Sequence, residues 1–209
     1  MIYTSPSNSD LIRQGDIFVG IPRFDFNLSK FPILVEDHPE EASWKDVVKE
    51  GKPVAALVGV VPVTAIVISQ DCDNLRAPDI NLCEIREFRD VERKCKETKK
   101  PKSWVKIITQ QARLNHKWFY LPPNKTLGFK EKMGVDFFVT LRIPREDLED
   151  LRDLRKGRLN DVACDHFRER ISEFYRRYAY DEWYPLNKEE MTFYKKDYPD
   201  AEYYPWQRK

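Results

Sequence analysis

The sequence predicts an α+β protein with a strand-rich N-terminal two-thirds and a helical C-terminal third. Short apolar runs rich in valine and isoleucine recur up to residue 143 and end at glycine, proline or aspartate, as strands do. Beyond Pro144, apolar residues recur with the spacing of amphipathic helices. Aromatic residues make up 13% of the chain, enough to form a core despite 34% charged residues. We expect a core over residues 1–144, with helices and an aromatic tail of residues 145–209 packed on it.

The N-terminal part begins with a predicted strand over residues 17–22, which Pro22 closes. Residues 23–42 are predicted to be irregular. A short helix is predicted over residues 43–50, because Ser43 and Asp46 form a capping-box pattern and Gly51 supplies a stop.

The longest apolar run of the chain covers residues 54–69 and is rich in valine. This composition is typical of strands buried on both faces. Pro62 lacks an N–H group, so we expect it to divide the run into two strands or to introduce a bulge. The next strand is predicted over residues 80–85, where apolar and polar residues alternate.

The remaining elements follow a basic insertion at about residues 86–113. Strands are predicted over residues 116–121 and 135–143. A helix is predicted from Pro144, with Leu148, Leu151 and Leu154 as its apolar stripe and Gly157 as its stop. A longer amphipathic helix is predicted over residues 160–178.

Composition narrows the class of protein. The apolar run at residues 53–68 is interrupted by Gly59 and Pro62 and is too short for a membrane span. The first residues lack a basic patch followed by an apolar stretch, and the four cysteines form no C-x-x-C pair. We therefore expect a cytoplasmic protein with free thiols, no membrane partner and no cofactor.

The sharpest local feature is the stretch Ser69-Gln70-Asp71-Cys72-Asp73, at the end of the long apolar run. An acid, amide and thiol held at the tip of a buried strand favour a site with perturbed pKa values. Cys72 would be the nucleophile, with Asp71, Asp73 and His166 as catalytic partners; His116 is the other candidate histidine. The alternative is a turn in which the aspartates bond backbone N–H groups. Gln70 and Asp16 are assigned structural roles.

Other site chemistry has little support in the sequence. Only three histidines are present and none has a second ligand four residues on, so no metal site is predicted; a zinc site of Cys72, Asp73 and His166 is the weaker alternative. Glycine loops that bind phosphate, G-x-S-x-G and H-E-x-x-H do not occur.

Charge is distributed unevenly along the chain. Residues 81–135 carry 14 Lys and Arg against 6 Asp and Glu, whereas both flanks are acidic. Cations interleaved with aromatic rings suit single-stranded RNA or DNA. A solvated loop beside core aromatics is the alternative. The candidate nucleic-acid-binding residues are Arg89, Arg93, Lys99, Lys100, Lys102 and Trp104.

Two stretches resemble a known family of bacterial toxins. Gln14-Gly15-Asp16-Ile17-Phe18 and Ala65-Ile66-Val67-Ile68-Ser69-Gln70-Asp71-Cys72-Asp73-Asn74 resemble the first strand and the second conserved strand of the MazF/PemK family. The resemblance covers about a third of the chain. It implies an SH3-like antiparallel β-barrel and either RNA cleavage or inhibition by an antitoxin. Val63-Thr64 stands where the toxins carry an Arg-Pro that acts in cleavage.

A second resemblance covers more of the chain. The stretches Gln14-Gly15-Asp16, Ser69-Gln70-Asp71-Cys72-Asp73, Tyr120-Leu121-Pro122-Pro123 and Val135-Asp136-Phe137, with the arginine-rich helix, are similar to an uncharacterised bacterial family with an [ST]-Q-x-C-D motif. That resemblance implies a bacterial or archaeal origin and one fold, without an activity.

These observations lead to one functional prediction and two alternatives. The leading hypothesis is a binding module of a toxin or defence locus that engages nucleic acid or a protein partner. The first alternative is an enzyme centred on Cys72. The second is a structural subunit that docks through its aromatic tail, after residue 180. The sequence does not determine an oligomeric state.

Overall fold

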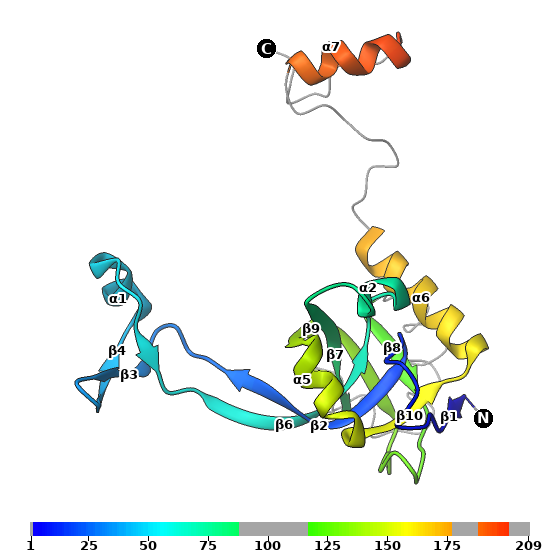
Figure 1. Cartoon of the computed structure of the whole chain (residues 1–209), viewed down its shortest axis with the longest axis horizontal. Helices are drawn as coiled ribbons and strands as arrows, with labels where there is room; N and C mark the ends of the chain where they lie inside the picture. The colour runs from blue at the N-terminus through cyan, green and yellow to red at the C-terminus, as the bar shows by residue number, and fades with distance from the viewer. Residues whose placement is uncertain (1, 88–116, 177–187, 201–209) are drawn as a thin grey trace, which may run out of the picture. The chain divides into compact units, whose positions relative to one another are not determined.

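The computed structural model describes residues 2–87, 117–176 and 188–200 and confirms the α+β class. Its main feature is an antiparallel seven-stranded sheet in the order β1-β10-β2-β6-β7-β9-β8, curled into a half-barrel (Figure 1). The chain divides into two compact units, Met1–Phe174 and Tyr175–Lys209. The strands of the main sheet are β1 (Tyr3–Thr4), β2 (Asp16–Asp25), β6 (Gly59–Val67), β7 (Asp79–Glu87), β8 (Trp118–Leu121), β9 (Met133–Pro144) and β10 (Arg155–Leu159).

The main sheet buries apolar side chains on both of its faces, because residues alternate between the faces along each strand. On one face, Ile17, Ile66 and Cys83 pack with Phe167 and Phe174 of helix α6 (Asp161–Arg176). On the other face, a second cluster packs with Leu148 of helix α5 (Arg145–Asp150). Its sheet members are Phe18, Ile21, Ala65, Val67, Ile80, Leu82, Leu141 and Ile143. The predicted strands at residues 17–22, 80–85 and 135–143 are confirmed in place, and the strand predicted over residues 116–121 is confirmed as β8 over Trp118–Leu121, with residue 116 outside the described residues.

A second, three-stranded sheet lies between β2 and β6 in the sequence. It consists of β3 (Phe31–Val35), β4 (His38–Ala42) and β5 (Ala55–Ala56), in the order β4-β3-β5. The prediction that residues 23–42 are irregular is therefore wrong. It failed because β4 reads His-Pro-Glu-Glu-Ala, whose polar side chains are mostly exposed and give no apolar alternation.

The long apolar run is not buried as predicted. Val67 and its two predecessors in β6 are buried, but the first half of the strand is exposed. Pro62 does not divide the run either, because it lies inside β6 and opposite Pro22 of β2. The run instead leaves the main sheet towards its N-terminal end, where β6 has only β2 as a neighbour.

Helix α1 (Trp44–Glu50) confirms the short helix, and Gly51 ends it with φ of 65° in the left-handed region. The capping box does not form. The Ser43 hydroxyl donates to the Asp46 carboxylate at 2.6 Å, rather than accepting a backbone N–H bond. Lys49 also bonds Asp46, and together with Ser43 these bonds lower the pKa of that carboxyl.

The predicted helix from Pro144 to Gly157 is shorter than expected. Helix α5 ends at Asp150, a 3₁₀ turn follows over Arg152–Leu154, and the chain then becomes strand β10. Gly157 is therefore a strand residue and not a helix stop, and an added Cβ there would lie 2.6 Å from the Leu127 side chain. The leucine spacing looked helical because Leu154 packs on the same core cluster as Leu148.

The predicted helix at residues 160–178 is confirmed as α6 over its described part. Asn160 precedes it, and its side chain accepts a bond from the Ala163 N–H at 2.9 Å, as an N-cap does. In the second unit, helix α7 (Lys188–Asp197) follows, and most of the aromatic tail lies outside the described residues.

Candidate functional site

The Gln14-Gly15-Asp16 motif forms a buried ionic centre at the start of β2. The Asp16 carboxylate binds the Arg155 guanidinium at 2.9 Å, and both side chains are fully buried. Arg158, on the same strand as Arg155, binds both oxygens of Asp16. Burial alone would lower the pKa of Arg158, but its bonds with Asp16 raise it overall. Asp16 therefore has the structural role predicted for it, and it ties β2 to β10.

Gln14 and Asp71 link the N-terminal loop to the end of β6. The Gln14 backbone N–H donates to the Asp71 carboxylate at 2.7 Å, and its side-chain amide donates to the Ile68 carbonyl at 2.6 Å. Arg168 of α6 donates to both residues, at 2.9 Å to Gln14 Oε1 and 3.1 Å to Asp71. Asp71 thus fixes the turn after β6 and belongs to a network that spans three parts of the chain.

The predicted Cys72 cluster is a single helical turn, α2 (Asp71–Asn74), directly after β6. Cys72 is exposed, and its sulfur lies 3.8 Å from both Gln70 Oε1 and Asp73 Oδ1, neighbours in the same turn. Asn74 is the buried member, and its side chain exchanges bonds with Ser69. The order of these groups matches the alternative of a polar turn that closes a strand.

The predicted partner His166 makes no contact with this turn among the described residues. His166 lies on α6, is largely exposed and faces Glu169 at 3.7 Å. The other candidate histidine, His116, lies outside the described residues. Within the described ranges, no group of three or more His, Cys, Asp or Glu side chains could hold a metal ion.

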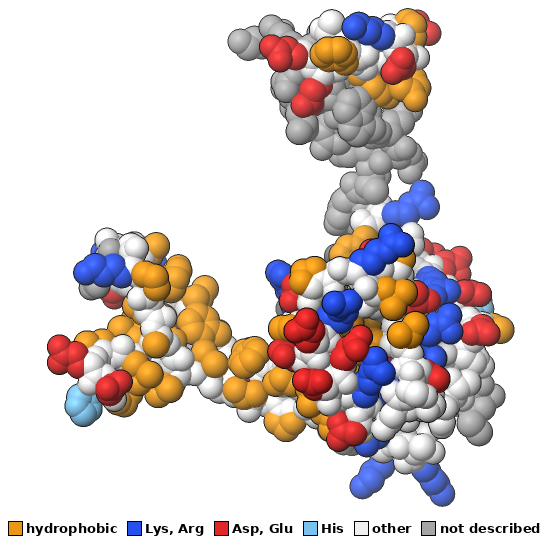
Figure 2. All heavy atoms as spheres, in the orientation of Figure 1, with side chains coloured by type: hydrophobic (Ala, Val, Ile, Leu, Met, Phe, Trp, Pro, Cys, Tyr) orange, Lys and Arg blue, Asp and Glu red, His pale blue; other side chains and the backbone are white. Residues whose placement is uncertain are grey.

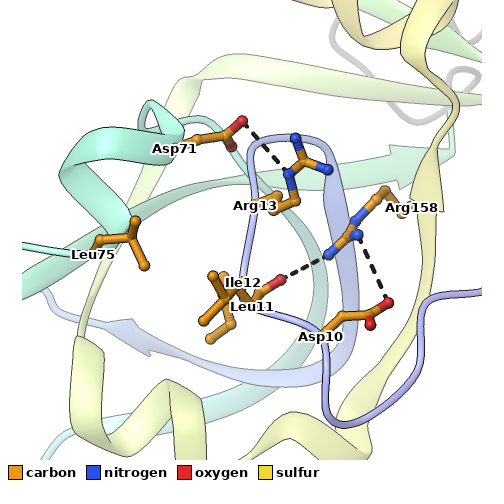
Figure 3. Close-up of a pocket in the computed structure, with 7 residues that line it drawn as sticks. All are labelled: Asp10, Leu11, Ile12, Arg13, Asp71, Leu75 and Arg158. Carbon is orange, nitrogen blue, oxygen red and sulfur yellow. Dashed lines mark hydrogen bonds and ion pairs between the residues drawn. The ribbon is translucent and has the colours of Figure 1, made fainter.

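A cavity of about 510 Å³ adjoins the turn and is lined by three aliphatic and four charged residues (Figure 3). Its charged groups are paired across the cavity wall: Arg13 lies 3.7 Å from Asp71, and Arg158 lies 4.0 Å from Asp10. The cavity therefore has no net charge to select an anion or a cation. Its lining residues are Asp10, Leu11, Ile12, Arg13, Asp71, Leu75 and Arg158.

The predicted nucleic-acid-binding residues lie outside the described residues. These are Arg89, Arg93, Lys99, Lys100, Lys102 and Trp104.

The strongest surface feature is apolar and lies in residues 22–62, which we call the arm. The arm comprises a two-stranded ribbon, formed by residues 22–25 of β2 and 59–62 of β6, together with the three-stranded sheet and α1. Twelve of the nineteen exposed large apolar side chains in the described chain belong to it, and Figure 2 shows apolar surface along the ribbon and over α1. These are Phe24, Phe26, Leu28, Leu34, Val35, Trp44, Val48, Val54, Leu57, Val58, Val60 and Val61.

The arm does not close a core of its own. Phe31 and Val47 are the only described apolar residues of the arm that are buried. A two-stranded ribbon or a small sheet with so little burial is marginally stable in water. Soluble monomers seldom expose contiguous apolar patches larger than a few hundred Å². The arm is therefore the most apolar exposed surface of the described residues.

The two faces of the ribbon differ. Phe24 pairs with Val60 and Pro22 with Pro62, so these four side chains share one uncharged face. The opposite face carries Arg23, which binds Asp25 at 3.0 Å and the buried Glu84 of β7 at 2.7 Å.

The ribbon edges are protected against strand addition. Pro22 and Pro62 face each other and neither has an N–H group, so they form a non-hydrogen-bonded pair whose backbone groups point to the outer edges. Each edge therefore lacks one donor that an added strand would need. The ribbon edges are thus less suited to strand addition than its apolar face is to side-chain packing.

A groove of about 360 Å³ continues this face onto the main sheet. Its ribbon side is formed by residues 22–24 and its other side by residues 138–143 of β9. Phe138 is 53% exposed at this place, and Arg142 is paired with Asp79 although its side chain is 73% exposed. The groove is therefore lined by polar and apolar groups alike, and its arginines are each paired with carboxylates of the chain, Arg23 with Asp25 and Glu84 and Arg142 with Asp79.

The sequence analysis missed the residues that organise the Asp71 network and those that form the arm. Gln14, Arg155 and Arg168 are far from Asp71 in the sequence, and no local pattern connects them. A signal for the arm was present, because Pro22 and Pro62 each interrupt an apolar strand in a way that central strands do not tolerate.

Comparison of the chain with family models, curated proteins and solved structures gives no match. None of the described helices has the length and apolar character needed to cross a bilayer.

Proposed function

We propose that this chain is a binding module that engages a protein partner through the apolar arm. The observation that carries the proposal is that the arm exposes twelve large apolar side chains, whereas among its described apolar residues only Phe31 and Val47 are buried. Burial of a valine, leucine or phenylalanine side chain contributes about 1.5–3 kcal/mol, so covering even a few of them would sustain a stable complex. The edge-blocking prolines support a side-chain interface over strand addition.

The charge of the arm supports a protein partner over nucleic acid or an anionic membrane. Residues 22–62 carry five Lys and Arg against seven Asp and Glu. Phosphate backbones and acidic lipids need the opposite sign of charge. An uncharged ribbon face with an acidic surround suits another folded protein.

Thiol protection in the living cell tests this function. In a background with Cys72→Ser and Cys95→Ser, a cysteine is introduced by Val48→Cys in the arm or, as the matched control, by Val162→Cys on α6. Val48 is 57% exposed and Val162 68% exposed. We expect a permeant maleimide to label position 162 rapidly and position 48 at least about tenfold more slowly, because a partner covers the arm. Equal labelling of both positions overturns the proposal.

The fold family and the type of genetic locus are also proposed. We propose an SH3-like barrel of the MazF/PemK type, which the curled antiparallel sheet supports, and a toxin or defence locus, which rests on the resemblance of Gln14-Gly15-Asp16 and the stretch after β6 to that family. RNA or DNA as a partner stays a prediction, because its residues lie outside the described chain. The Cys72 enzyme also stays a prediction, and the local polar contacts of Cys72 give it no support.

A further inference from the structure

We propose that the ion pair between Arg23 and Glu84 is a latch that sets the direction of the arm, and that the arm turns about its ribbon when the latch opens. Arg23 belongs to the ribbon and Glu84 to β7 of the main sheet, and their charged groups meet at 2.7 Å. This inference goes beyond the proposed function and holds for the chain without a partner.

The arm is joined to the main sheet by two strands only. Towards the arm, Ile21 is the last buried residue of β2, and Thr64 is the last residue of β6 that pairs with β7. From there outward, β2 and β6 pair only with each other. A two-stranded ribbon twists more than a wider sheet and has little stability of its own. The ribbon can therefore change direction at this point unless a side chain holds it.

Arg23 is the side chain that holds the ribbon. Within the described ranges, its bond to Glu84 is the only hydrogen bond or ion pair between a side chain of the arm and the rest of the chain. Asp25 aims the guanidinium, because it accepts bonds from two of the nitrogens at 3.0 and 3.2 Å and leaves Nη1 for Glu84. One ion pair thus fixes where the ribbon points.

A second arginine beside Glu84 makes the latch reversible. The Glu84 side chain is 7% exposed, so a charge left there without a partner would be strongly unfavourable. Arg86 lies 3.7 Å from the other carboxylate oxygen and is 38% exposed, so it can move closer when Arg23 leaves. The buried carboxylate then keeps a partner in both positions of the arm.

Opening of the latch would also change the groove beside the ribbon. Residues 22–24 form one wall of this groove, and residues 138–143 of β9 form the other. The second wall belongs to the main sheet, where β9 pairs with β7, so only the first wall moves with the arm. The latch therefore sets the width of the groove as well as the direction of the arm.

Pulsed electron paramagnetic resonance on the pure full-length chain measures the direction of the arm. Nitroxide labels are attached at Val48→Cys in the arm and at Val162→Cys on α6, in the cysteine background of the labelling experiment above. The remaining described thiols, Cys83 and Cys164, are buried. The measured quantity is the distribution of distances between the two labels.

Removal of the latch should broaden this distribution. We expect Arg23→Gln to make it at least about twofold wider, because the ribbon is no longer held. Arg142→Gln is the matched control: it removes an arginine that is paired with Asp79 inside the main sheet, and it should leave the width unchanged. An unchanged distribution in Arg23→Gln overturns the latch. A variant that no longer folds, as judged by circular dichroism, overturns it too, since Arg23 would then be an anchor of the fold.

Urea denaturation tests the exchange of arginine partners. Because either arginine can pair with Glu84, Arg23→Gln and Arg86→Gln should each lower the free energy of unfolding only slightly. The double variant should lose more than the sum of the two single losses. Additive losses overturn the reversible latch. Both measurements use the pure chain, so their failure leaves the in-cell protection at position 48 as a separate test of the protein partner.

Discussion

The Asp16 carboxylate and the Arg155 guanidinium meet at 2.9 Å with neither side chain exposed to solvent. Arg155 also donates to backbone carbonyls of the N-terminal loop, at 2.9 Å to Asp10 and 3.1 Å to Leu11. One ion pair thus holds the loop, β2 and β10 together. The loop in turn presents Gln14 to Asp71, so the position of the turn after β6 depends on this pair.

Loss of this ion pair should strongly destabilise the chain. Asp16→Asn leaves the Arg155 charge buried and uncompensated, and removal of one partner of such a pair costs about 3–5 kcal/mol. Asp79→Asn is the control, since its partner Arg142 is largely exposed and solvent screens such pairs, so its loss should be much smaller. Urea denaturation of the two variants measures the difference. Equal losses would show that the buried pair is not the anchor.

Gly15 should not tolerate a side chain. Its φ is 89°, and an added Cβ would lie 3.3 Å from Leu159 Cβ and 3.4 Å from Cys164 Sγ. Gly15→Ala should lower the free energy of unfolding by about 2–3 kcal/mol, through strain and crowding together. Gly128→Ala isolates the backbone strain. Gly128 has φ of 73°, but an added Cβ there would meet no neighbouring atom within 4 Å, so the substitution should lower the free energy of unfolding by about 1 kcal/mol. Thermal unfolding of both variants gives the comparison.

Thiol reactivity should follow burial. Cys72 is exposed, whereas Cys83 and Cys164 are buried and burial raises the pKa of both thiols. In a Cys95→Ser background, we expect one fast-reacting thiol in the native chain and two more after denaturation. Cys72→Ser should abolish the fast reaction. A fast phase that persists in that variant would contradict the burial of the other two.

Alkaline pH should destabilise the fold in part through Cys83. Burial, with the Asp136 carboxylate beside it, raises the pKa of this thiol to about 12. The pKa of a thiol in the unfolded chain is about 8.5, so above that pH the native state binds more protons than the unfolded state. The stabilisation is complete below about pH 8.5 and is lost as pH rises towards the native pKa. Cys83→Ala should lessen the fall in unfolding free energy between about pH 8.5 and 10.5. An unchanged slope would exclude this contribution.

The sequence predicted five strands of the main sheet, β2, β6, β7, β8 and β9, but neither the two-residue β1 nor β10, which it assigned to the end of a helix. Ile17, Ile66 and Ile85 lie in apolar stretches of three predicted strands and are all buried. The helix α6 was equally readable, since Phe167 and Phe174 lie on one face of it. A local sequence pattern is enough to predict a strand or helix that buries one face against a single core.

The arm could not be read in this way. Val58, Val60 and Val61 have the composition of a buried strand, yet they lie on the surface. Intramolecular rules place such residues inside, and the proposed partner surface would account for their exposure here. The candidate site failed for the opposite reason: Gln14 and Arg168 meet Asp71 only after folding, and Cys72 is left at the surface of its turn.

Amide hydrogen exchange with and without cell lysate tests the account most directly. We expect the backbone amides of residues 31–35 and 44–49 to exchange more slowly when the chain is labelled in lysate of its own cells than when the pure chain is labelled, because a partner orders and covers the arm. Amides of residues 79–87, in the middle of the main sheet, should exchange at the same rate in both samples. Identical exchange of the arm in the two samples would contradict coverage of the arm by a protein partner.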